Sequence, residues 1–406
     1  MVIEQISIEK LRKLDNTPGA TRTRWLDNKW IYAVKQIFPL YFALHMALLV
    51  LSCCVVLFVQ SDFSATHPHL QDLLLYWSRK DVGWYRRIAT EGYTDVQRTA
   101  FFPLFPLLIR LGTYVTGLNG FYVGAFISNA AWFVLLVILF QLVKEDYDEK
   151  RAQATVLYLS LFPTSFFFAT AYTEAPFLCL TLLSFYHLRR GRWWLAALFA
   201  FFAGLTRSAG VFLALPFCYE YMRQRQFNVR AIRLDVISLF IIPLSVILFA
   251  GYCYISFGDP LAFSHAQTFW SRVLSVPWYG IVEAFSVAWR SGLLGFWGIR
   301  NLMDVGCVLF VFFLLLLGSF GPWRLGKERT SYLILAWTFY LFVLLVPVHS
   351  DFPLQSMPRF MLEIFPAFII LADFDKVPFI RLNYFLVSGV LLFVMMTQFL
   401  TGHWIV

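Results

Sequence analysis

The chain has 406 residues, of which 59% are hydrophobic and only 14% are charged, whereas soluble domains are about half apolar and about a quarter charged. This composition excludes a soluble globular protein and indicates an all-α, polytopic membrane protein. The net charge of +9 does not indicate nucleic-acid binding, because the cations lie in short segments between apolar runs.

The first 36 residues are polar and precede the first apolar run. They lack the apolar core of a cleaved secretion signal, and we expect residues 1–36 to form a cytoplasmic tail. The six cysteines lie inside apolar runs and lack metal-site spacing, so the sequence predicts neither a disulfide framework nor a cysteine metal site.

Apolar runs of roughly twenty residues predict membrane-spanning helices. We expect spans at 37–59, 121–143, 152–171, 175–189, 236–257, 303–320, 331–348, 359–373 and 382–402. Two shorter helices, 193–206 and 209–220, flank Thr206-Arg207-Ser208 and predict a hairpin of half-helices, whose irregular tip must be covered by protein or line a cavity. Residues 1–406 are therefore predicted to form one membrane domain of about eleven helices.

The segment FFPLFPLLIRLGTYVTG (101–117) fits either a span or an interfacial helix. The interfacial assignment places the basic segments 1–36, 144–151, 189–192, 221–234, 321–329 and 373–381 on one side of the membrane. These segments hold roughly two thirds of the 33 lysines and arginines, so the positive-inside rule favours this topology. The N-terminus is then cytoplasmic, the C-terminus is outside, and 61–120 is a long first extracytoplasmic loop with interfacial helices.

The stretch KDVGWYRRIATEGY (80–93) of this loop places an acid among aromatic residues. Helical periodicity puts Trp77, Asp81, Trp84, Tyr85 and Ile88 on one face. Burial of an unpaired carboxylate on such a face is costly, which suggests a function for Asp81. The alternative is an ordinary interfacial helix in which Asp81 pairs with Lys80 or Arg87.

The same topology brings several ionisable groups to the outer side of the membrane. They are Asp81, Arg98, Glu174, the tip Thr206-Arg207-Ser208, His265 and Arg359. Convergence of such groups at one face of a bundle is typical of a functional cavity. The alternative is that these groups are unrelated charges of separate loops.

Four motifs, in the same order, resemble a known family. KDVGWYRRIATEGY with AFFPLFPLLIR, LFPTSFFFATAYTEAPF (161–177), AGLTRSAG (203–210) and SMPRFMLEIFP (356–366) are similar to motifs of the PIG-V mannosyltransferases, within the GT-C superfamily of glycosyltransferases that use lipid-linked sugars. The resemblance covers about residues 70–370. One departure is Lys80, where the family has Trp, and a cation there is expected to weaken Asp81 as a base.

The resemblance implies that a sugar, typically mannose, moves with inversion from a polyprenyl- or dolichyl-phosphate carrier to a hydroxyl of a glycan, glycolipid or protein. The residue chemistry agrees with this implication. A single displacement needs one general base, whereas hydrolysis needs a pair of carboxyl groups. The leaving phosphate needs positive charge, which arginine supplies in bidentate form.

We therefore expect Asp81 to be the catalytic base. The expected donor-phosphate residues are Arg207, Arg359 and Arg98. Arg207 is also aided by the N-terminus of the helix that follows it. The alternatives are an arginine that reaches the lipid interface for Arg207 and an anchor of its span for Arg359.

The expected substrate-binding residues are Glu174, Trp84, Tyr85 and Tyr93. Glu174 is expected to bind sugar hydroxyls or to orient the surroundings of Asp81, unless it is a solvated acid of a turn. The three aromatic residues are expected to stack on a pyranose ring, unless they belong to an interfacial belt.

No cofactor and no metal are predicted, because His67, His69, His265 and His349 lack metal-site spacing. A transporter or flippase of lipid-linked or small solutes is the alternative function, and a non-catalytic scaffold is a third. The prediction favours the enzyme, since the chain has no internal repeat and a long aromatic loop. A prokaryotic plasma membrane is expected, or the endoplasmic reticulum in a eukaryote.

Overall fold

The structure is a computed structural model that describes residues 20–58 and 70–403, with side chains described from residues 28 and 73 onward in these ranges. Within them the chain is helical, and its only β contact is an isolated bridge between Arg272 and Val348. This confirms the predicted all-α fold. Helices satisfy their backbone hydrogen bonds internally, which the hydrocarbon region of a membrane requires.

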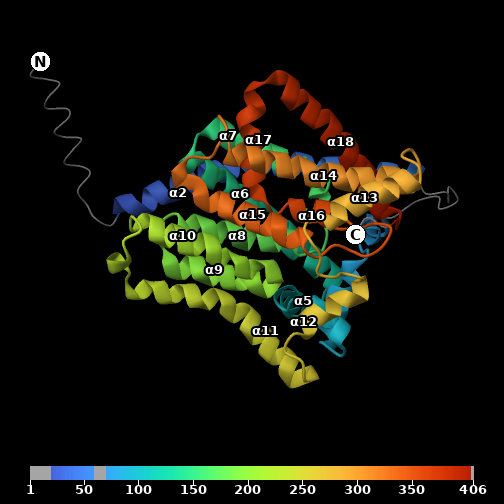
Figure 1. Cartoon of the computed structure of the whole chain (residues 1–406), viewed down its shortest axis with the longest axis horizontal. Coiled ribbons are helices and arrows are strands. Elements are labelled where there is room, and N and C mark those ends of the chain that lie inside the picture. Colours follow the sequence, from blue (N-terminus) through green and yellow to red (C-terminus); the bar gives the residue numbers. More distant parts are fainter. Residues whose placement is uncertain (1–19, 59–69, 404–406) are drawn as a thin grey trace, which may run out of the picture.

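Five helices of the described ranges are long and apolar enough to cross a membrane. They are α2 (Ala20–Phe58, with the apolar part Asn28–Phe58), α6 (Gly120–Asp146), the combined segment of η5 (Leu234–Phe240) and α11 (Ile241–Phe257), α14 (Phe296–Ser319) and α18 (Pro378–Leu400). They run beside shorter helices (Figure 1). Helix α2 begins well before the predicted span at 37, so part of the predicted tail continues the membrane helix.

The shorter helices fill the interior of the bundle. They are α8 (Glu174–Leu188), α9 (Trp193–Thr206), η3 (Ser208–Leu213), α10 (Ala214–Gln224) and α15 (Thr330–Leu344). One face of α9 carries four fully buried alanines, Ala196, Ala197, Ala200 and Ala203. Such small residues allow helices to approach closely in membranes. The predicted half-helix hairpin is thus confirmed, although its second arm is divided into η3 and α10.

The prediction of a continuous span at 152–171 is wrong. Helix α7 (Glu149–Ser160) ends early and is followed by the short η2 (Ser165–Phe168), because Pro163 cannot continue a helix. Hydroxyl groups satisfy the carbonyls left without helical partners. The Ser165 hydroxyl donates to the Ser160 carbonyl at 2.7 Å, and the Ser388 hydroxyl donates to the Leu161 carbonyl at 2.6 Å.

The predicted continuous span at 359–373 is also broken, into α16 (Met357–Met361) and α17 (Phe365–Leu371). Pro366 at the start of α17 is consistent with this restart. The first interruption lies against α16, since the Thr164 hydroxyl donates to the Pro358 carbonyl at 2.9 Å. Irregular backbone is therefore buried within protein on both segments, as the membrane interior requires.

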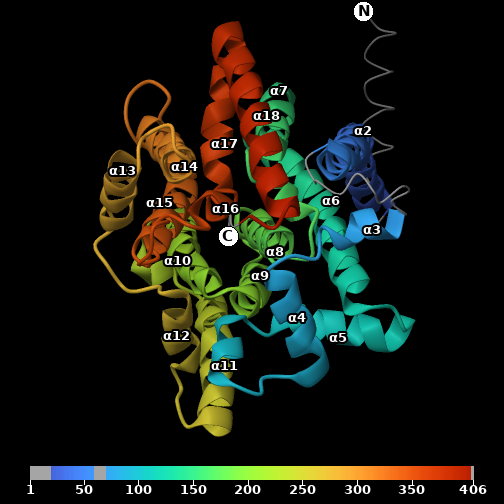
Figure 2. The same ribbon diagram turned by 90° about the vertical axis from the view of Figure 1, so that its right-hand side faces the viewer.

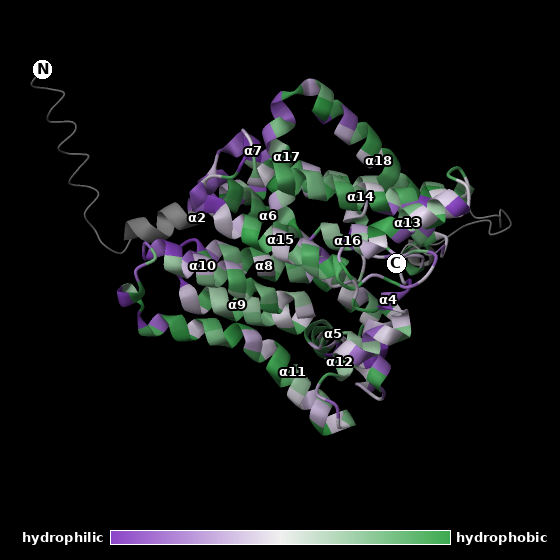
Figure 3. Ribbon diagram, in the orientation of Figure 1, coloured by the Kyte–Doolittle hydropathy of each residue, from purple (hydrophilic) through white to green (hydrophobic). Residues whose placement is uncertain are grey.

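The predicted cytoplasmic segments meet at one end of the bundle, near η4 (Val229–Ala231), η7 (Lys327–Arg329) and η8 (Ala372–Lys376). Arg189 lies 3.2 Å from Asp146 and 3.4 Å from Glu220. Arg151 lies 3.2 Å from Asp373. Hydrophilic residues gather at the ends of the helices while their lengths are hydrophobic (Figure 3).

The opposite end carries a layer of short helices, which faces the viewer in Figure 2. The layer contains α3 (Leu70–Leu75), α4 (Asp81–Glu91), η1 (Val96–Ala100), α5 (Leu104–Thr116), α12 (Ala262–His265), η6 (Ala266–Trp270) and α13 (Tyr279–Arg290). Leu107, Leu111 and Tyr114 of α5 are exposed, as the predicted interfacial helix requires. Helix α13 was not predicted.

Candidate active site

Helix α4 begins at Asp81, so the predicted helical face that includes Trp77 is wrong. Lys80 has φ 51° and ψ −113°, a backbone conformation that L-residues rarely adopt, and it directly precedes the helix. Trp77 lies in the preceding turn, where its indole donates to the Ser52 hydroxyl at 3.2 Å. Asp81 therefore projects from the first turn of α4.

Buried side chains hold this end of α4 against the segment that precedes α8. The Tyr172 hydroxyl accepts from the Asp81 amide and donates to the Arg79 carbonyl, both at 3.3 Å. The Tyr85 hydroxyl lies 3.1 Å from the Thr173 hydroxyl, and burial raises the pKa of Tyr85. Asp81 is thus fixed beside the N-terminus of α8.

The carboxylate of Asp81 pairs with an arginine far along the chain. The Arg359 Nη1 donates to Asp81 Oδ2 at 2.9 Å, and the two side chains are 8% and 18% exposed, respectively. Arg87, one of the partners proposed from the sequence, instead places its guanidinium 5.9 Å from the Trp84 ring centre. The pKa of Lys80, the other proposed partner, is lowered chiefly by burial and next by Arg79, while the neighbouring Asp81 acts to raise it.

Glu174 joins two arginines. Its Oε1 lies 3.0 Å from Arg359 Nε and accepts a hydrogen bond from Arg207 Nη1, also at 3.0 Å. The carboxylate is fully buried at the first residue of α8, where the helix N-terminus adds favourable positive potential. Glu174 is therefore not a solvated acid of a turn, and its Oε1 faces arginines.

Arg207 occupies the tip of the hairpin, between α9 and η3. It has extended backbone angles, and its Nη1 lies 3.0 Å from Glu363 Oε1 as well as from Glu174. The tip is tight, because a Cβ on Gly210 would lie 2.3 Å from the backbone nitrogen of Gly204. Backbone-to-backbone packing thus places Arg207 beside the two acids.

Two further charged residues lie beside these acids and arginines, and the sequence analysis did not identify them. Glu363 is buried between α16 and α17, and Arg272 lies in the loop after η6. The ring centre of Phe360 lies 4.5 Å from the Arg207 guanidinium, 5.1 Å from that of Arg359 and 5.6 Å from that of Arg272. We call Asp81, Glu174, Arg207, Arg272, Arg359 and Glu363 the acid–arginine cluster.

The three arginines of the cluster differ in their carboxylate partners, because Arg207 and Arg359 each form ion pairs whereas Arg272 forms none within the described residues. Arg272 Nη1 donates to the Val346 carbonyl at 3.3 Å, and within the described residues it has no ion pair with a carboxylate. Burial, together with the nearby cation Arg359, lowers the pKa of Arg272 to about 10, although Asp81 acts in the opposite direction. Arg272 is therefore a cation with positive neighbours, which is typical of a site that receives an anion. Only its place in an outer loop distinguished it in the sequence.

Other predicted site residues do not join the cluster. Arg98 lies 2.7 Å from Glu91 and 3.0 Å from Asp95, and it closes the loop after α4. The Tyr93 hydroxyl donates to the Phe101 carbonyl at 2.7 Å, so its ring supports the same loop. His265 is also separate, because it pairs with Asp259 at 2.7 Å.

The aromatic residues differ in accessibility. Tyr85 is buried in a small core with Phe105, so it offers no face for stacking. Trp84 is half-buried, with its ring centre 5.8 Å from those of Phe101 and Trp270. Trp84 and Trp270 thus form an aromatic corner between α4 and the loop that carries Arg272.

The described residues offer no cluster of metal ligands. They contain no group of three or more His, Cys, Asp or Glu side chains arranged to hold a metal ion. His349 Nε2 lies 3.1 Å from the Ser275 hydroxyl. His67 and His69 lie outside the described residues.

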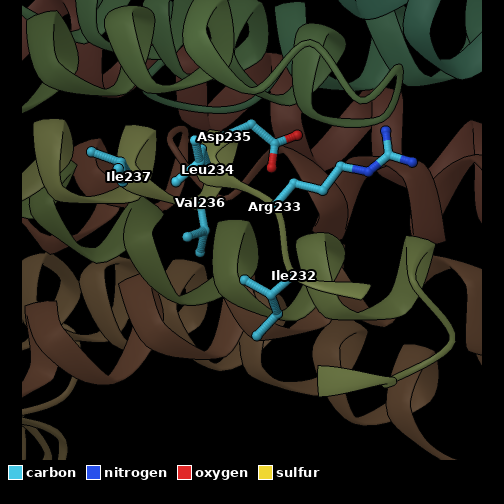
Figure 4. A pocket seen from close by; sticks show the side chains of 6 residues that line it. All are labelled: Ile232, Arg233, Leu234, Asp235, Val236 and Ile237. Atoms are coloured by element: carbon cyan, nitrogen blue, oxygen red, sulfur yellow. The ribbon is translucent and has the colours of Figure 1, made fainter. Parts of the chain in front are cut away.

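A hollow at the opposite end of the bundle is unrelated to the cluster. It is lined by the consecutive residues Ile232, Arg233, Leu234, Asp235, Val236 and Ile237 (Figure 4). Asp235 is paired with Arg225 at 2.9 Å and accepts from the Tyr221 hydroxyl at 2.5 Å. The carboxylate of this hollow, Asp235, therefore stabilises the loop.

The chain is similar in sequence to a known protein family and to several of its members. Residues 31–317 match the family model for mannosyltransferase (PIG-V). GPI alpha-1,6-mannosyltransferase 2 of Mus musculus is 28% identical over 211 residues, which are 47% of this chain and 43% of the relative. The Homo sapiens protein is 31% identical over 152 residues, or 35% of this chain and 31% of the relative. The matched region thus spans less than half the length of these curated relatives.

The fold is similar to that of a protein of known structure. ArnT from Cupriavidus metallidurans, in a crystal structure bound to undecaprenyl phosphate, aligns with a TM-score of 0.50 and 14% identity over 78% of this chain and 61% of that chain. This agrees with the GT-C-like bundle predicted from the sequence. Because the family model covers most of the sequence, the chain belongs to the PIG-V family of mannosyltransferases.

Proposed function

We propose that this membrane protein is an inverting glycosyltransferase that moves mannose from a polyprenyl-phosphate carrier to an acceptor hydroxyl. The observation that carries the proposal is the contact between Asp81 and Arg359, with Arg207 held next to Arg359 by Glu174. The names of the relatives specify a mannosyltransferase, and the similar ArnT structure contains a polyprenyl phosphate. Both agree with this chemistry.

Asp81 is the general base in this proposal. Its carboxylate takes the proton of the acceptor hydroxyl while the hydroxyl oxygen forms a bond to the sugar C1. The bond between C1 and the phosphate oxygen breaks on the opposite face, and its electron pair leaves with the phosphate. One carboxylate is sufficient, because the departing phosphate needs no proton at neutral pH.

Arginines stabilise the departing phosphate. Arg359 and Arg207 are connected through Glu174, and Arg272 lies with them around the Phe360 ring. A guanidinium can bind two phosphate oxygens at once, and such interactions strengthen in a buried site. Arg272 therefore replaces Arg98 as the third donor-phosphate residue, since the carboxylates of Glu91 and Asp95 engage Arg98.

The roles of the other predicted substrate-binding residues are assigned from how accessible their side chains are and from the contacts that they make. Trp84, with Trp270 beside it, offers a ring for sugar stacking, whereas Tyr85 and Tyr93 hold the loop in place. Glu174 is a positioning residue for the two arginines. These assignments narrow the four predicted substrate-binding residues to Trp84.

The location of the cluster disfavours a transporter. Transporter sites for ions and solutes lie typically near the middle of the membrane, between repeated halves. Here the acids and arginines gather where α4, α8, α9 and α16 meet, at the end away from the basic loops (Figure 2). A non-catalytic scaffold does not account for a partly exposed carboxylate beside three arginines.

The basic segments define the side of the membrane. We infer that the end with Arg189 and Arg151 is cytoplasmic and that the acid–arginine cluster faces outward. The acceptor is then a glycan, glycolipid or protein on the outer or lumenal surface, and membrane lipids surround the bundle. We propose a prokaryotic plasma membrane, or the endoplasmic reticulum in a eukaryotic cell.

A donor comparison tests the proposed function. The purified protein, in lipid nanodiscs, is incubated with a lipid extract as acceptor and with one of two donors. The donor is either polyprenyl-phosphate-mannose or GDP-mannose, and its mannose is labelled. Label is expected to move from the polyprenyl-phosphate donor alone, with inversion at C1. Transfer from GDP-mannose, or retention at C1, contradicts the proposal.

A further inference from the structure

Arg359 contacts two carboxylates that differ in burial. Glu174 is fully buried, whereas the Asp81 side chain retains 18% of its exposure. Glu174 is itself held by Arg207, so one side of the Arg359 guanidinium is fixed within the protein. The Asp81 contact lies at the edge of the cluster and is the more accessible of the two.

Both members of this edge contact have another role in the proposed function. While Asp81 Oδ2 accepts the hydrogen bond from Arg359, that oxygen is occupied and is not free to accept the proton of an acceptor hydroxyl. The Nη1 of Arg359, occupied by Asp81, is also a group that would bind a phosphate oxygen. The base and the phosphate ligand must therefore separate before both can act.

We propose that the donor phosphate takes the place of Asp81 on Arg359, so that donor binding releases the carboxylate to act as the base. This inference rests on the proposed function. Glu174 keeps Arg359 in position during the exchange, because its contacts with Arg359 and Arg207 lie away from Asp81. Arg272, which has no carboxylate ion pair within the described chain, gives the arriving phosphate an initial contact.

The exchange also accounts for product release. The proton taken from the acceptor resides on Asp81 after transfer, and a neutral carboxyl group does not compete with phosphate for Arg359. When Asp81 loses this proton to water, its charge is restored and it again attracts Arg359. The ion pair then reforms as the polyprenyl phosphate leaves, and the site returns to the arrangement in the structure.

Binding of polyprenyl phosphate alone tests the exchange without catalysis. The affinity of the protein for labelled undecaprenyl phosphate is measured in nanodiscs for the wild type, for Asp81→Asn and for Asp81→Ser. Removing a competing charged hydrogen bond is expected to tighten binding by about tenfold in both variants. The Glu91→Gln variant, which changes an exposed acid of the same helix, is the control and is expected to bind like the wild type.

Each outcome is decisive. Unchanged or weaker binding by both Asp81 variants overturns the exchange and leaves the proposed function standing. Failure of the wild type to bind undecaprenyl phosphate overturns the donor assignment and the exchange with it. Loss of folded protein in both Asp81 variants identifies the Asp81–Arg359 pair as structural and also overturns the exchange.

Discussion

At the scale of single residues, the proposed role of Arg207 in binding the donor phosphate can be tested apart from acceptor binding. We predict that Arg207→Ala raises the KM for the polyprenyl-phosphate donor by at least about tenfold, because a charge-assisted contact is lost. The KM for the acceptor is expected to change less. Separate titrations of donor and acceptor measure both values, with Arg86→Gln on the exposed face of α4 as the control. An unchanged donor KM contradicts the assignment.

Sequence motifs led to four members of the acid–arginine cluster. Asp81, Glu174, Arg207 and Arg359 are ionisable residues in apolar stretches of the sequence. Because such placement costs free energy, it indicates a functional site. Glu363 is an equivalent signal within SMPRFMLEIFP that was overlooked. The direction of an aromatic or basic side chain in a loop depends on tertiary contacts. The sequence therefore could not show that Tyr85, Tyr93 and Arg98 stabilise the loop around α4.

At the scale of secondary-structure elements, the tight hairpin tip leaves no room for a side chain at position 210, which is Gly210. A Cβ there would meet the backbone of Ala203 and Gly204 at 2.3 to 2.6 Å, so the hairpin must open. We predict that Gly210→Ala lowers stability by about 2 kcal/mol and reduces transfer by displacing Arg207. Thermal unfolding and transfer assays measure the two effects.

Gly251→Ala is the matched control for this substitution. Gly251 lies in α11, and a Cβ there would meet nothing within 4 Å. Its stability and activity are expected to match the wild type. Equal behaviour of Gly210→Ala and Gly251→Ala contradicts the close packing described for the tip.

Helix α14 contains a buried ion pair that the sequence analysis did not identify. Arg300 and Asp304 are 2% and 1% exposed, Arg300 Nε lies 3.9 Å from Asp304 Oδ2, and the Arg300 guanidinium lies 4.6 Å from the Phe352 ring centre. We predict that Arg300→Met alone is destabilising by about 3 kcal/mol, because it leaves Asp304 without compensation. The double variant with Asp304→Leu is expected to regain most of this loss.

A double-mutant cycle measured by thermal unfolding tests this pair. The cycle comprises the wild type, each single variant and the double variant, with protein in the same nanodiscs throughout. Strong coupling supports an interacting pair. If the two single effects add without coupling, Arg300 and Asp304 act independently and the prediction is wrong.

Element boundaries were predictable where apolar runs were long and uninterrupted. Helices α6, α9 and α18 lie close to their predicted ranges. The spans at 152–171 and 359–373 were wrong because hydropathy does not detect a broken helix whose free backbone groups are satisfied by neighbours. Pro163 and Pro366 were visible in the sequence, but the hydroxyl contacts that permit the breaks depend on the fold.

At the scale of the whole molecule, the fold separates a basic end from the end that carries the acid–arginine cluster. We predict that a cysteine replacing the exposed Arg230, in a Cys218→Ser background, resists a membrane-impermeant maleimide in intact cells and reacts after permeabilisation. The background removes the exposed native thiol. A cysteine replacing the exposed Thr94 is expected to react in both conditions. Labelling of position 230 from outside reverses the proposed orientation.

The most direct test of the account is the transfer activity of Asp81→Asn. Mannose transfer from polyprenyl-phosphate-mannose is measured for the wild type, Asp81→Asn and the Glu91→Gln control, with thermal unfolding to show that each is folded. The account predicts that Asp81→Asn is folded and loses activity by about 100-fold or more, as removal of a general base requires, while Glu91→Gln stays active. Activity of folded Asp81→Asn within a few-fold of the wild type would contradict the assignment of Asp81 as the base.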